Sequence, residues 1–357
     1  MLPENLEDIP LCFIVSTGRT GSTLLSTMLN AHPDVLSISE QPFTLDLIDG
    51  YSKKKIWKES DLENYISDFK LFASTKISTQ FSSYKQLREN IFLHNQNINF
   101  NNIIKLSLLS FFPSKQKSSI KLIIAKELIF HTQIKKISAT YPNAKFILLT
   151  RDPRDNVLIK INRAKRRNET YNIFRFIYAW RVVYSKLYFD LIKYAQNRFK
   201  ILKYEDLINQ PESTLKDICN FLSISFNEEM MNYKTKNITE FENKKETMPE
   251  ELVTHLLRDH QGLLQNINPE KIGIWKKQLH LTTSKQIWNE CKEPAQIFGY
   301  KADFPDDFQN EKLGVTYKIF KVQYYLYNIL RPQIYFKTPF WLRRCYRKLK
   351  YKFVQTE

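Results

Sequence analysis

Residues 11–29 read L-C-F-I-V-S-T-G-R-T-G-S-T-L-L-S-T-M-L, and this stretch decides the fold. Its first part, Leu11 to Thr17, is a short apolar run that ends in a polar turn containing Gly18 and Gly21. Its last part, Thr23 to Leu29, continues with the spacing of a helix. This order predicts a buried strand, a loop and a helix.

The turn between the predicted strand and helix has the composition of an anion-binding loop. A glycine-containing turn there exposes backbone N–H groups at a helix N-terminus, which attract phosphate or sulfate. Arg19 adds a fixed positive charge, and Ser22 and Thr23 add hydroxyl donors. The ATP- or GTP-binding loop G-x-x-x-x-G-K-[ST] is not present, because no Gly-Lys pair follows Gly18 or Gly21. On spacing alone, a plain strand-to-helix turn and an anion site both stay open.

Three further apolar stretches have the length of buried strands. They are Ile120 to Ala125, Lys145 to Thr150 and Phe199 to Lys203. Helical patterns separate or follow them, at Phe130 to Thr140, Asp155 to Arg167, Tyr171 to Gln196 and Asn209 to Met230. Apolar strands that alternate with helices predict an α/β fold with a mostly parallel sheet covered on both faces.

The remaining segments suggest one domain with two additions. Residues 45–118 carry amphipathic patches without a strong period, and we interpret them as a helical insertion that shapes an acceptor pocket. Because no convincing linker appears before about residue 310, residues 1–312 are expected to form one domain. Residues 313–357 form a basic, aromatic C-terminal extension.

The composition limits the classes of partner and compartment. The chain has 54 Lys+Arg against 37 Asp+Glu, a surplus of +17 that predicts anionic partners without choosing among them. Its four cysteines lie far apart, which argues against a disulfide framework and a zinc site, and Cys12 is expected in the core. The first ten residues are acidic, unlike a signal peptide, and no apolar run is long enough to span a bilayer. We therefore expect a cytoplasmic protein, with docking on the inner face of a membrane as an option.

Four motifs resemble the sulfotransferase family. The segment G-R-T-G-S-T-L-L-x-x-M-L-x-x-H-P at 18–33 resembles its loop for the 5′-phosphosulfate of 3′-phosphoadenosine 5′-phosphosulfate (PAPS). The segment at 141–155 resembles its strand and turn for the 3′-phosphate, and 204–211 resembles a stretch of its tyrosylprotein and carbohydrate branches. The segment at 273–279, with F-G-Y at 298–300, fits the same pattern. The resemblance implies a P-loop-like three-layer α/β fold and PAPS as sulfuryl donor, with no metal.

The resemblance also assigns roles to individual residues. Arg19 would hold the 5′-phosphosulfate, and Lys126 would stabilise the departing phosphate. Glu40 would take the proton of the acceptor hydroxyl, with His131 and His94 as rival bases. The nucleotide would be bound by Gly18, Arg19, Thr20, Gly21, Ser22, Thr23, Arg151, Asn156 and Tyr204. Trp275 and Lys271 are candidates for closing over it.

One departure from the family's pattern leaves a second function open. The family places a serine eight residues after the arginine that corresponds to Arg151, and this chain has Ile159 there. Isoleucine cannot donate that hydrogen bond, so either Lys160 or Asn156 compensates or recognition of the 3′-phosphate is weakened. The first hypothesis is sulfuryl transfer to a hydroxyl of a carbohydrate, glycolipid or other acceptor. The alternative is a non-catalytic anion- or membrane-binding protein on a degenerate scaffold.

The C-terminal extension needs an explanation of its own. Residues 313–357 hold ten Lys+Arg and one acid. From Phe340 onward, helical spacing puts Trp341, Leu342, Cys345, Tyr346, Leu349 and Phe353 on one side and most Lys and Arg on the other. This pattern is typical of an interfacial segment on an anionic membrane, and also of a terminal helix that packs on the domain with a solvated basic face. No motif suggests nucleic-acid binding or sets an oligomeric state.

Overall fold

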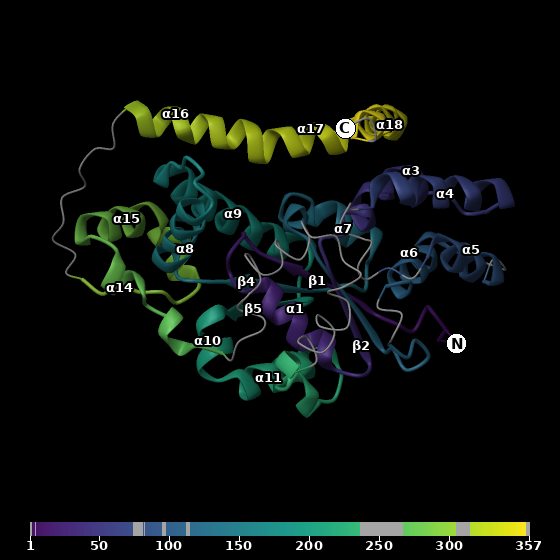
Figure 1. Ribbon diagram of the computed structural model, residues 1–357, viewed down its shortest axis with the longest axis horizontal. Helices are drawn as coiled ribbons and strands as arrows, with labels where there is room; N and C mark the ends of the chain where they lie inside the picture. The colour runs from purple at the N-terminus through teal and green to yellow at the C-terminus, as the bar shows by residue number, and fades with distance from the viewer. Residues whose placement is uncertain are drawn as a thin grey trace.

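The computed structural model describes residues 2–3, 5–73, 81, 83–94, 98–111, 115–235, 267–304 and 315–354. Within them, a five-stranded parallel sheet of order β2-β3-β1-β4-β5 lies between two layers of helices (Figure 1). The strands are β1 (Leu11–Val15), β2 (Val35–Ser39), β3 (Leu122–Lys126), β4 (Lys145–Thr150) and β5 (Phe199–Lys203). The predicted α/β, three-layer architecture is confirmed.

The strand β2 was not predicted, because two serines interrupt its short apolar pattern. Ser37 and Ser39 are accommodated by α1 (Ser22–Ala31), whose Ser26 hydroxyl lies 2.8 Å and 3.1 Å from theirs. The hydroxyls of Ser37 and Ser39 therefore have a hydrogen-bond partner inside the protein. Their partner lies on a different element, which a local pattern does not reveal.

Each face of the sheet carries its own hydrophobic core. Along β1, Phe13 and Val15 join the larger core, whereas Cys12 and Ile14 join the smaller one. This alternation is the period of a strand that is buried on both faces. Cys12 is fully buried, as predicted.

The smaller core is covered by α1, by α10 (Tyr204–Asn209), by α11 (Pro211–Leu222) and by the short helix η3 (Glu228–Met230). The larger core lies under η2 (Leu128–Thr132), α7 (Ile134–Thr140), α8 (Pro153–Arg166), α9 (Ile173–Tyr194) and α15 (Leu281–Ile297). Two predicted helices are broken. The first begins as the 3₁₀ turn η2 before α7, and the second ends at Leu222, where Ser223 adopts a left-handed conformation (φ 63°).

The described part of the insertion at 45–118 is mainly helical, as predicted, with turns between the helices and one isolated β-bridge, Phe81 to Phe111. Its helices are α3 (Ile48–Tyr51), α4 (Glu59–Phe72), α5 (Tyr84–Leu93) and α6 (Phe100–Leu109), preceded by α2 (Phe43–Asp46). Residues 74–80, 82, 95–97 and 112–114 lie outside the described residues. Two short helices, η5 (Pro269–Lys271) and α14 (Trp275–Gln278), precede α15.

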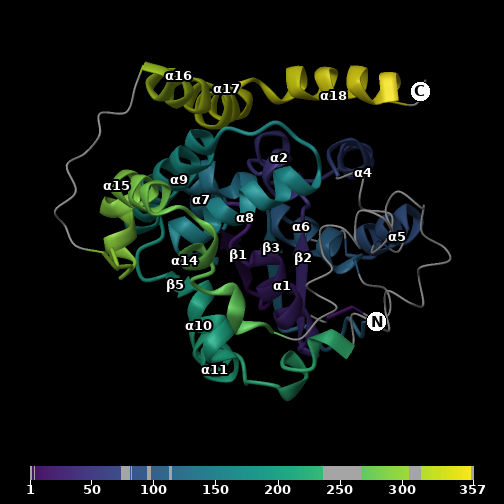
Figure 2. The same cartoon turned by 60° about the vertical axis from the view of Figure 1, so that its left-hand side comes forward.

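The C-terminal extension crosses the outside of the body as a long strap (Figures 1 and 2). It consists of α16 (Val315–Tyr324), the π-helix η6 (Tyr325–Leu330), α17 (Arg331–Lys337) and α18 (Phe340–Val354). Phe340 stacks on Phe72 (ring centroids 5.5 Å apart) and sits directly on Gly50, where a Cβ would come within 2.6 Å of its ring. The extension is therefore seated in a recess that requires glycine at position 50.

Arginines of α18 point into the body rather than into solvent. Arg343 is buried and pairs with Asp46 (3.7 Å) and Asp49, and Arg344 pairs with Asp68 (2.6 Å). A solvated basic face is thus wrong for these arginines, because buried carboxylates on the body require cationic partners. Trp341, Leu342, Tyr346 and Leu349 are exposed instead, while Phe353 falls outside the described side chains. Among the described residues, none of the helices combines the length and the apolar composition needed to cross a bilayer.

Candidate active site

A cleft of about 1900 Å³ lies at the carboxyl edge of the sheet. Every strand contributes to its lining at or just after its carboxyl end: Gly18 and its neighbours follow β1, Glu40 follows β2, Lys126 ends β3, Arg151 follows β4 and Tyr204 follows β5. Binding at this edge is the rule for open parallel sheets, because the loops that follow the strands meet there. The fold therefore brings residues from five separate segments into one cavity.

The glycine turn forms the floor of the cleft at the N-terminus of α1. Gly21 is the N-cap residue of that helix and has φ 88°, a left-handed conformation that suits glycine. A Cβ at this position would lie 2.4 Å from the Tyr204 ring. Arg19 also has a positive φ, 68°, which strains a non-glycine residue and is typical of functional sites.

The residues predicted for this loop have two different tasks. Gly18, Arg19, Gly21, Ser22 and Thr23 line the cleft. Thr20 is fully buried and its hydroxyl donates to the carbonyl oxygen of Thr17 (3.1 Å). Asn156 is also fully buried, and its side-chain amide donates to the carbonyl oxygen of Gly18 (3.0 Å). Thr20 and Asn156 therefore shape the loop from behind and are not among the residues that line the cleft.

Lys126 and Glu40 lie side by side at the ends of two adjacent strands. Their Nζ and Oε1 atoms are 3.9 Å apart, and the backbone N–H of Glu40 donates to the carbonyl oxygen of Lys126 (2.8 Å). The side chain of Lys126 is only 5% exposed, whereas that of Glu40 is 37% exposed. Glu40 has φ 62°, so its backbone is strained where its carboxylate faces the cavity. The arrangement pairs a buried cation with a carboxylate that solvent and ligand can reach.

Arg151 is held in place from two sides. Its Nη2 donates to the carbonyl oxygen of Lys271 (2.6 Å), and its guanidinium lies 4.0 Å from the centre of the Tyr204 ring. The side chain is buried and, among the described residues, its Nε has no hydrogen-bond partner. A buried guanidinium with an unsatisfied donor beside a cleft suits an anionic ligand.

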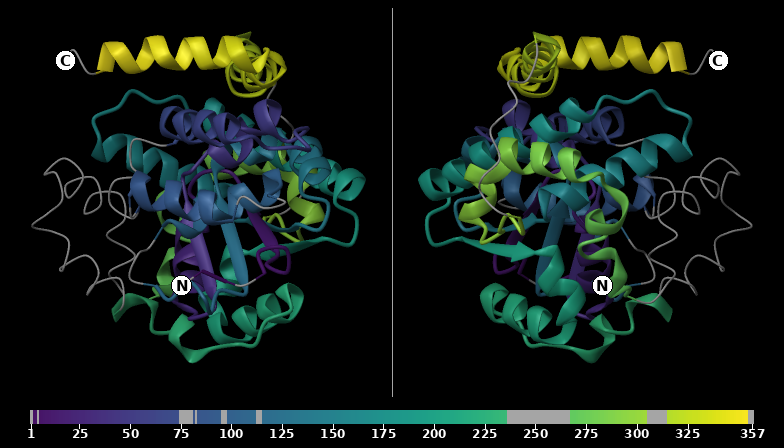
Figure 3. Two further views of the ribbon diagram at one scale, coloured as in Figure 1. Left: turned by 90° about the vertical axis from the view of Figure 1, so that its right-hand side faces the viewer. Right: turned by 90° about the vertical axis from the view of Figure 1, so that its left-hand side faces the viewer.

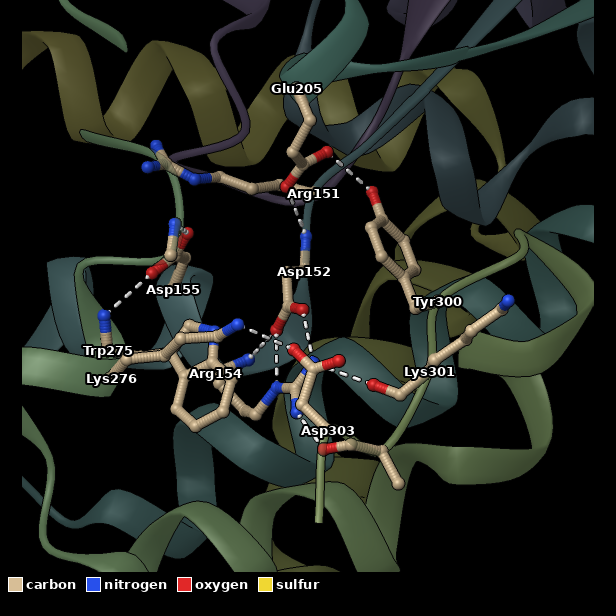
Figure 4. A network of polar contacts seen from close by, with 12 residues as sticks. Arg151, Asp152, Arg154, Asp155, Glu205, Trp275, Lys276, Tyr300, Lys301 and Asp303 are labelled. Atoms are coloured by element: carbon tan, nitrogen blue, oxygen red, sulfur yellow. Dashed lines mark hydrogen bonds and ion pairs between the residues drawn. The ribbon is translucent and has the colours of Figure 1, made fainter. Parts of the chain in front are cut away.

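The segments with the later motifs dock onto the turn around Arg151 (Figure 4). Asp155 accepts hydrogen bonds from the backbone N–H groups of Gly273 (2.7 Å) and Trp275 (3.0 Å). Glu205 accepts one from the hydroxyl of Tyr300 (2.9 Å). Burial raises the pKa of Asp155 and of Glu205, and these donors favour their ionised forms. Three of the four motifs, which are distant in sequence, thus form one polar network.

Trp275 belongs to the support of the site rather than to its lining. Its indole lies 3.9 Å from the guanidinium carbon of Arg154, a fully buried arginine that pairs with Asp152 (2.7 Å). Lys271, by contrast, lines the cleft. Of the two residues predicted to close over a nucleotide, only Lys271 is placed to touch one.

The two histidines considered as bases do not line the cleft in the part of the chain that the structure describes. The Nδ1 atom of His131 bonds to the carbonyl oxygen of Leu128, and burial lowers the pKa of His131 to about 4. His94 bonds in the same way to the carbonyl oxygen of Asn90 (2.8 Å). Both contacts are local and structural. Glu40 is therefore the candidate base that the geometry favours over these histidines.

Ile159 stands where the family pattern has a serine, and the residue next to it can replace the missing hydrogen-bond donor. Ile159 and Lys160 both line the cleft on α8, whereas the amide of Asn156 is engaged by the glycine turn. Burial, together with the positive charge of Arg19, lowers the pKa of Lys160 to about 8. An anion bound next to Lys160 would favour its charged form. Lys160 is thus the better placed of the two compensating candidates.

The outer wall of the cleft was missed by sequence reasoning. It is built by α8 and the start of α9, with Arg163, Arg166, Arg167 and Arg175, and by the extension, with Tyr324 and Tyr327 among its residues. No described residue of the insertion at 45–118 lines the cleft, so the expectation that this segment shapes the pocket is wrong for them. The run R-A-K-R-R at 163–167 was a usable signal, because its arginines recur at helical spacing.

No group of His, Cys, Asp and Glu side chains within the described ranges is arranged to hold a metal ion. The charged groups that line the cleft are mostly Lys and Arg, with Glu40 and Glu169 as the carboxylates. Glu169 lies 3.3 Å from Arg167. The cavity as a whole therefore suits a multiply anionic ligand.

Known proteins resemble this chain in sequence and fold. The protein-tyrosine sulfotransferase 1 of Danio rerio is 25% identical over 231 residues, which cover 64% of this chain and 57% of that protein. The protein-tyrosine sulfotransferase 2 of Gallus gallus is 24% identical over 230 residues, which cover 64% and 55%. The chain thus spans a little over half the length of these curated relatives.

Two solved structures illustrate the similarity in fold. The sulfotransferase domain of the Synechococcus PCC 7002 olefin synthase has a TM-score of 0.49 and 18% identity, covering 85% of this chain and 99% of that one. A mouse sulfotransferase in complex with PAP has a TM-score of 0.41 and 13% identity, covering 90% of each chain.

A family model described as "Sulfotransferase family" matches residues 10–228, more than half of the chain. The matched region contains the glycine turn, Glu40, Lys126, Arg151 and Tyr204, which are the residues that the strands bring to the cleft. The chain therefore belongs to the sulfotransferase family.

Proposed function

We propose that this protein transfers the sulfuryl group of PAPS to a hydroxyl group of an acceptor by in-line displacement. The observation that carries the proposal is the convergence of a helix N-terminus, Arg19, Lys126, Glu40 and Arg151 at one edge of the sheet. Membership of the sulfotransferase family supports it.

The cleft fits the donor at both of its anionic ends. The backbone N–H groups at the start of α1, with Arg19 and the hydroxyls of Ser22 and Thr23, would hold the 5′-phosphosulfate. Arg151, whose Nε lacks a partner among the described residues, would hold the 3′-phosphate together with Lys160. PAPS supplies an activated sulfuryl group, and no metal is needed for this chemistry.

Residues of the protein would stabilise the charge that develops on the leaving phosphate and would take up the proton of the acceptor hydroxyl. During transfer, the bond from the acceptor oxygen to sulfur forms, the bond from sulfur to the phosphate oxygen breaks, and negative charge develops on that phosphate. Lys126 and the α1 N-terminus would stabilise this charge in a cavity of low dielectric constant. Glu40 would accept the proton that the hydroxyl loses.

Glu40→Gln is expected to lower turnover by about a hundredfold, because the amide keeps the shape of the carboxylate but cannot take a proton. Binding of adenosine 3′,5′-bisphosphate (PAP) should change little, since Glu40 follows the edge strand β2, on the other side of Lys126 from the glycine turn and Arg151. Turnover with a labelled donor and calorimetry with PAP measure the two effects. Glu169→Gln, which alters the other carboxylate in the cleft, serves as the control. Unchanged turnover in Glu40→Gln would assign the base to another group.

For the acceptor, we propose a carbohydrate or glycolipid hydroxyl, modified in the cytoplasm or at its membrane face. The wide outer wall with Tyr171, Tyr324 and Tyr327 supports this, because sugar rings pack on aromatic side chains and the cavity is far larger than a single ring requires. No sequence motif favours nucleic acid as a partner.

The isoleucine at position 159 supports one alternative function, that of a non-catalytic anion-binding protein. Calorimetry with PAP and transfer from labelled PAPS to extracted glycans, lipids and tyrosine peptides separate the two. We expect PAP to bind with micromolar affinity, which corresponds to about 8 kcal/mol of binding free energy. We also expect the label in a hydroxyl-bearing acceptor. PAP binding without any transfer would favour the second candidate, and the absence of PAP binding would exclude the first.

A further inference from the structure

The extension carries a band of exposed apolar side chains on its outer side. We define it as the docking face: Ile319, Val322, Tyr325, Ile334, Trp341, Leu342, Tyr346 and Leu349, each 40% to 63% exposed. Single exposed apolar residues are ordinary on protein surfaces, but exposed apolar residues that recur along consecutive helices indicate an interaction site. The docking face contains much of the large exposed apolar surface of the described chain.

The orientation of this face is fixed by the contacts on the opposite side of the same helices. Arg343 is inserted between Asp46 and Asp49, and Phe340 is seated on Gly50. Turning α18 so that Trp341 faced the body would leave the buried carboxylate of Asp46 without its arginine partners, which is costly. The views along the strap show α18 as the outermost layer of the molecule (Figure 3). The apolar side chains therefore point outward because the arginines point inward.

Positive charge surrounds the docking face. Residues 315–354 contain no Asp or Glu. Among the described side chains, Lys318, Arg331, Lys337 and Lys348 are exposed along the same helices, whereas Lys321 lies over the Tyr178 ring of the body (5.7 Å). Aromatic and aliphatic side chains interleaved with exposed Lys and Arg match the headgroup region of an anionic bilayer. A protein partner of this chemistry would need to bring the matching acidic groups itself.

We propose that the docking face seats the protein on the surface of an anionic bilayer, with its aromatic rings among the headgroups and its Lys and Arg side chains on lipid phosphates. The extension lies on one side of the body, so its helices can approach a flat surface without obstruction by the sheet domain (Figures 1 and 2). The membrane contact is reversible and peripheral, because only the outer side of the helices is apolar.

The same helices connect the docking face to the cleft. Ile319 and Val322 point outward, whereas Phe320, Gln323 and Tyr324 line the cavity. The outer wall of the cleft is thus the inner side of the membrane-bound helix. If the proposed sulfuryl transfer holds, on which this step rests, the acceptor is a hydroxyl on a molecule anchored in the same bilayer.

Vesicle co-sedimentation of the full chain tests the docking face without any nucleotide. Vesicles of phosphatidylcholine with phosphatidylglycerol should bind the protein, and vesicles of phosphatidylcholine alone should bind it about tenfold more weakly. The triple variant Trp341→Ser, Tyr346→Ser, Leu349→Ser should lose about tenfold in affinity for the anionic vesicles. Its control replaces three equally exposed residues on other elements, Leu93→Ser, Phe189→Ser and Leu281→Ser, and should bind like the parent protein.

A second measurement, fluorescence quenching, uses a single conservative variant and so does not depend on whether the triple variant folds. Brominated lipids should quench the fluorescence of the parent protein, and Trp341→Phe should remove most of that quenching. Equal binding of the triple variant and the parent, or no binding to anionic vesicles, would overturn the proposal. A concentration-dependent dimer that the triple variant loses, without vesicle binding, would assign the face to a second copy of the chain instead. Transfer to soluble but not lipid-linked glycans would leave the proposed function standing and reject the anchored acceptor.

Discussion

Lys126→Met is expected to lower the turnover of sulfuryl transfer by about a thousandfold, which corresponds to about 4 kcal/mol of lost transition-state stabilisation. Lys126 is the last residue of β3 and lies between Ile14 of β1 and Ser39 of β2 in the register of the sheet. It is almost completely buried, so water cannot replace it where charge develops on the leaving phosphate. Methionine keeps the length of the side chain and removes only the charge.

The measurements separate chemistry from binding and folding. Turnover with a labelled donor should fall, whereas the affinity for PAP should change by less than about tenfold, because the helix N-terminus and Arg151 remain. The thermal transition should stay close to that of the parent protein. Lys121→Met is the matched control: this lysine precedes the same strand, but it is exposed and pairs with Asp34 (2.7 Å) away from the cleft. Turnover near that of the parent protein in Lys126→Met would remove the proposed mechanism.

Gly21→Ala is expected to reduce the affinity for PAP by at least about a hundredfold, roughly 3 kcal/mol. The new Cβ would lie 2.4 Å from the Tyr204 ring, and the left-handed backbone (φ 88°) alone costs alanine about 1–2 kcal/mol. Relief of the clash moves either the N-terminus of α1 or Tyr204. Because Arg151 stacks on Tyr204, the displacement would disturb both anion-binding ends of the cleft.

Two comparisons make this expectation specific. Gly18→Ala should bind PAP nearly as well as the parent protein, because its Cβ would meet only the Leu128 side chain, at 3.9 Å. The double variant Gly21→Ala, Tyr204→Leu should recover part of the lost affinity by removing the clashing ring. Calorimetry with PAP measures all three variants. Equal losses in Gly18→Ala and Gly21→Ala would show that close packing against Tyr204 is not what the loop requires.

The local pattern was sufficient to predict most of the sheet. The bounds predicted for β4 and β5 agree with the structure. The apolar run of β4 forms a buried strand, whereas β5 mixes apolar and charged residues as an edge strand that is mostly half-buried or exposed. The predicted glycine turn occurs where the strand-to-helix pattern put it. The strand β2 was missed since Ser37 and Ser39 find their hydrogen-bond partner in α1, a contact that no local period encodes.

The site was predictable only in part. Arg19, Glu40, Lys126, Arg151 and Tyr204 were named from motifs, and the structure brings all of them to one cleft. Thr20 and Asn156 belong to the same motifs but lie behind the loop, because a motif does not record which way a side chain points. The arginines of the outer wall showed only a helical spacing, and no sequence pattern places the aromatic residues of the extension beside the cleft.

The sequence by itself determined the elements whose causes are local: the buried strands, the turn that only glycine can make at position 21, and the two-sided pattern of the last helix. The tertiary structure alone decided which side of that helix faces the body. Periodicity shows that Trp341 and Leu349 share a face opposite Arg343, but it does not show what lies beneath. Asp46, Asp49 and Asp68, contributed by distant helices, supply the charge that draws the arginines inward and leaves the aromatic side in solvent.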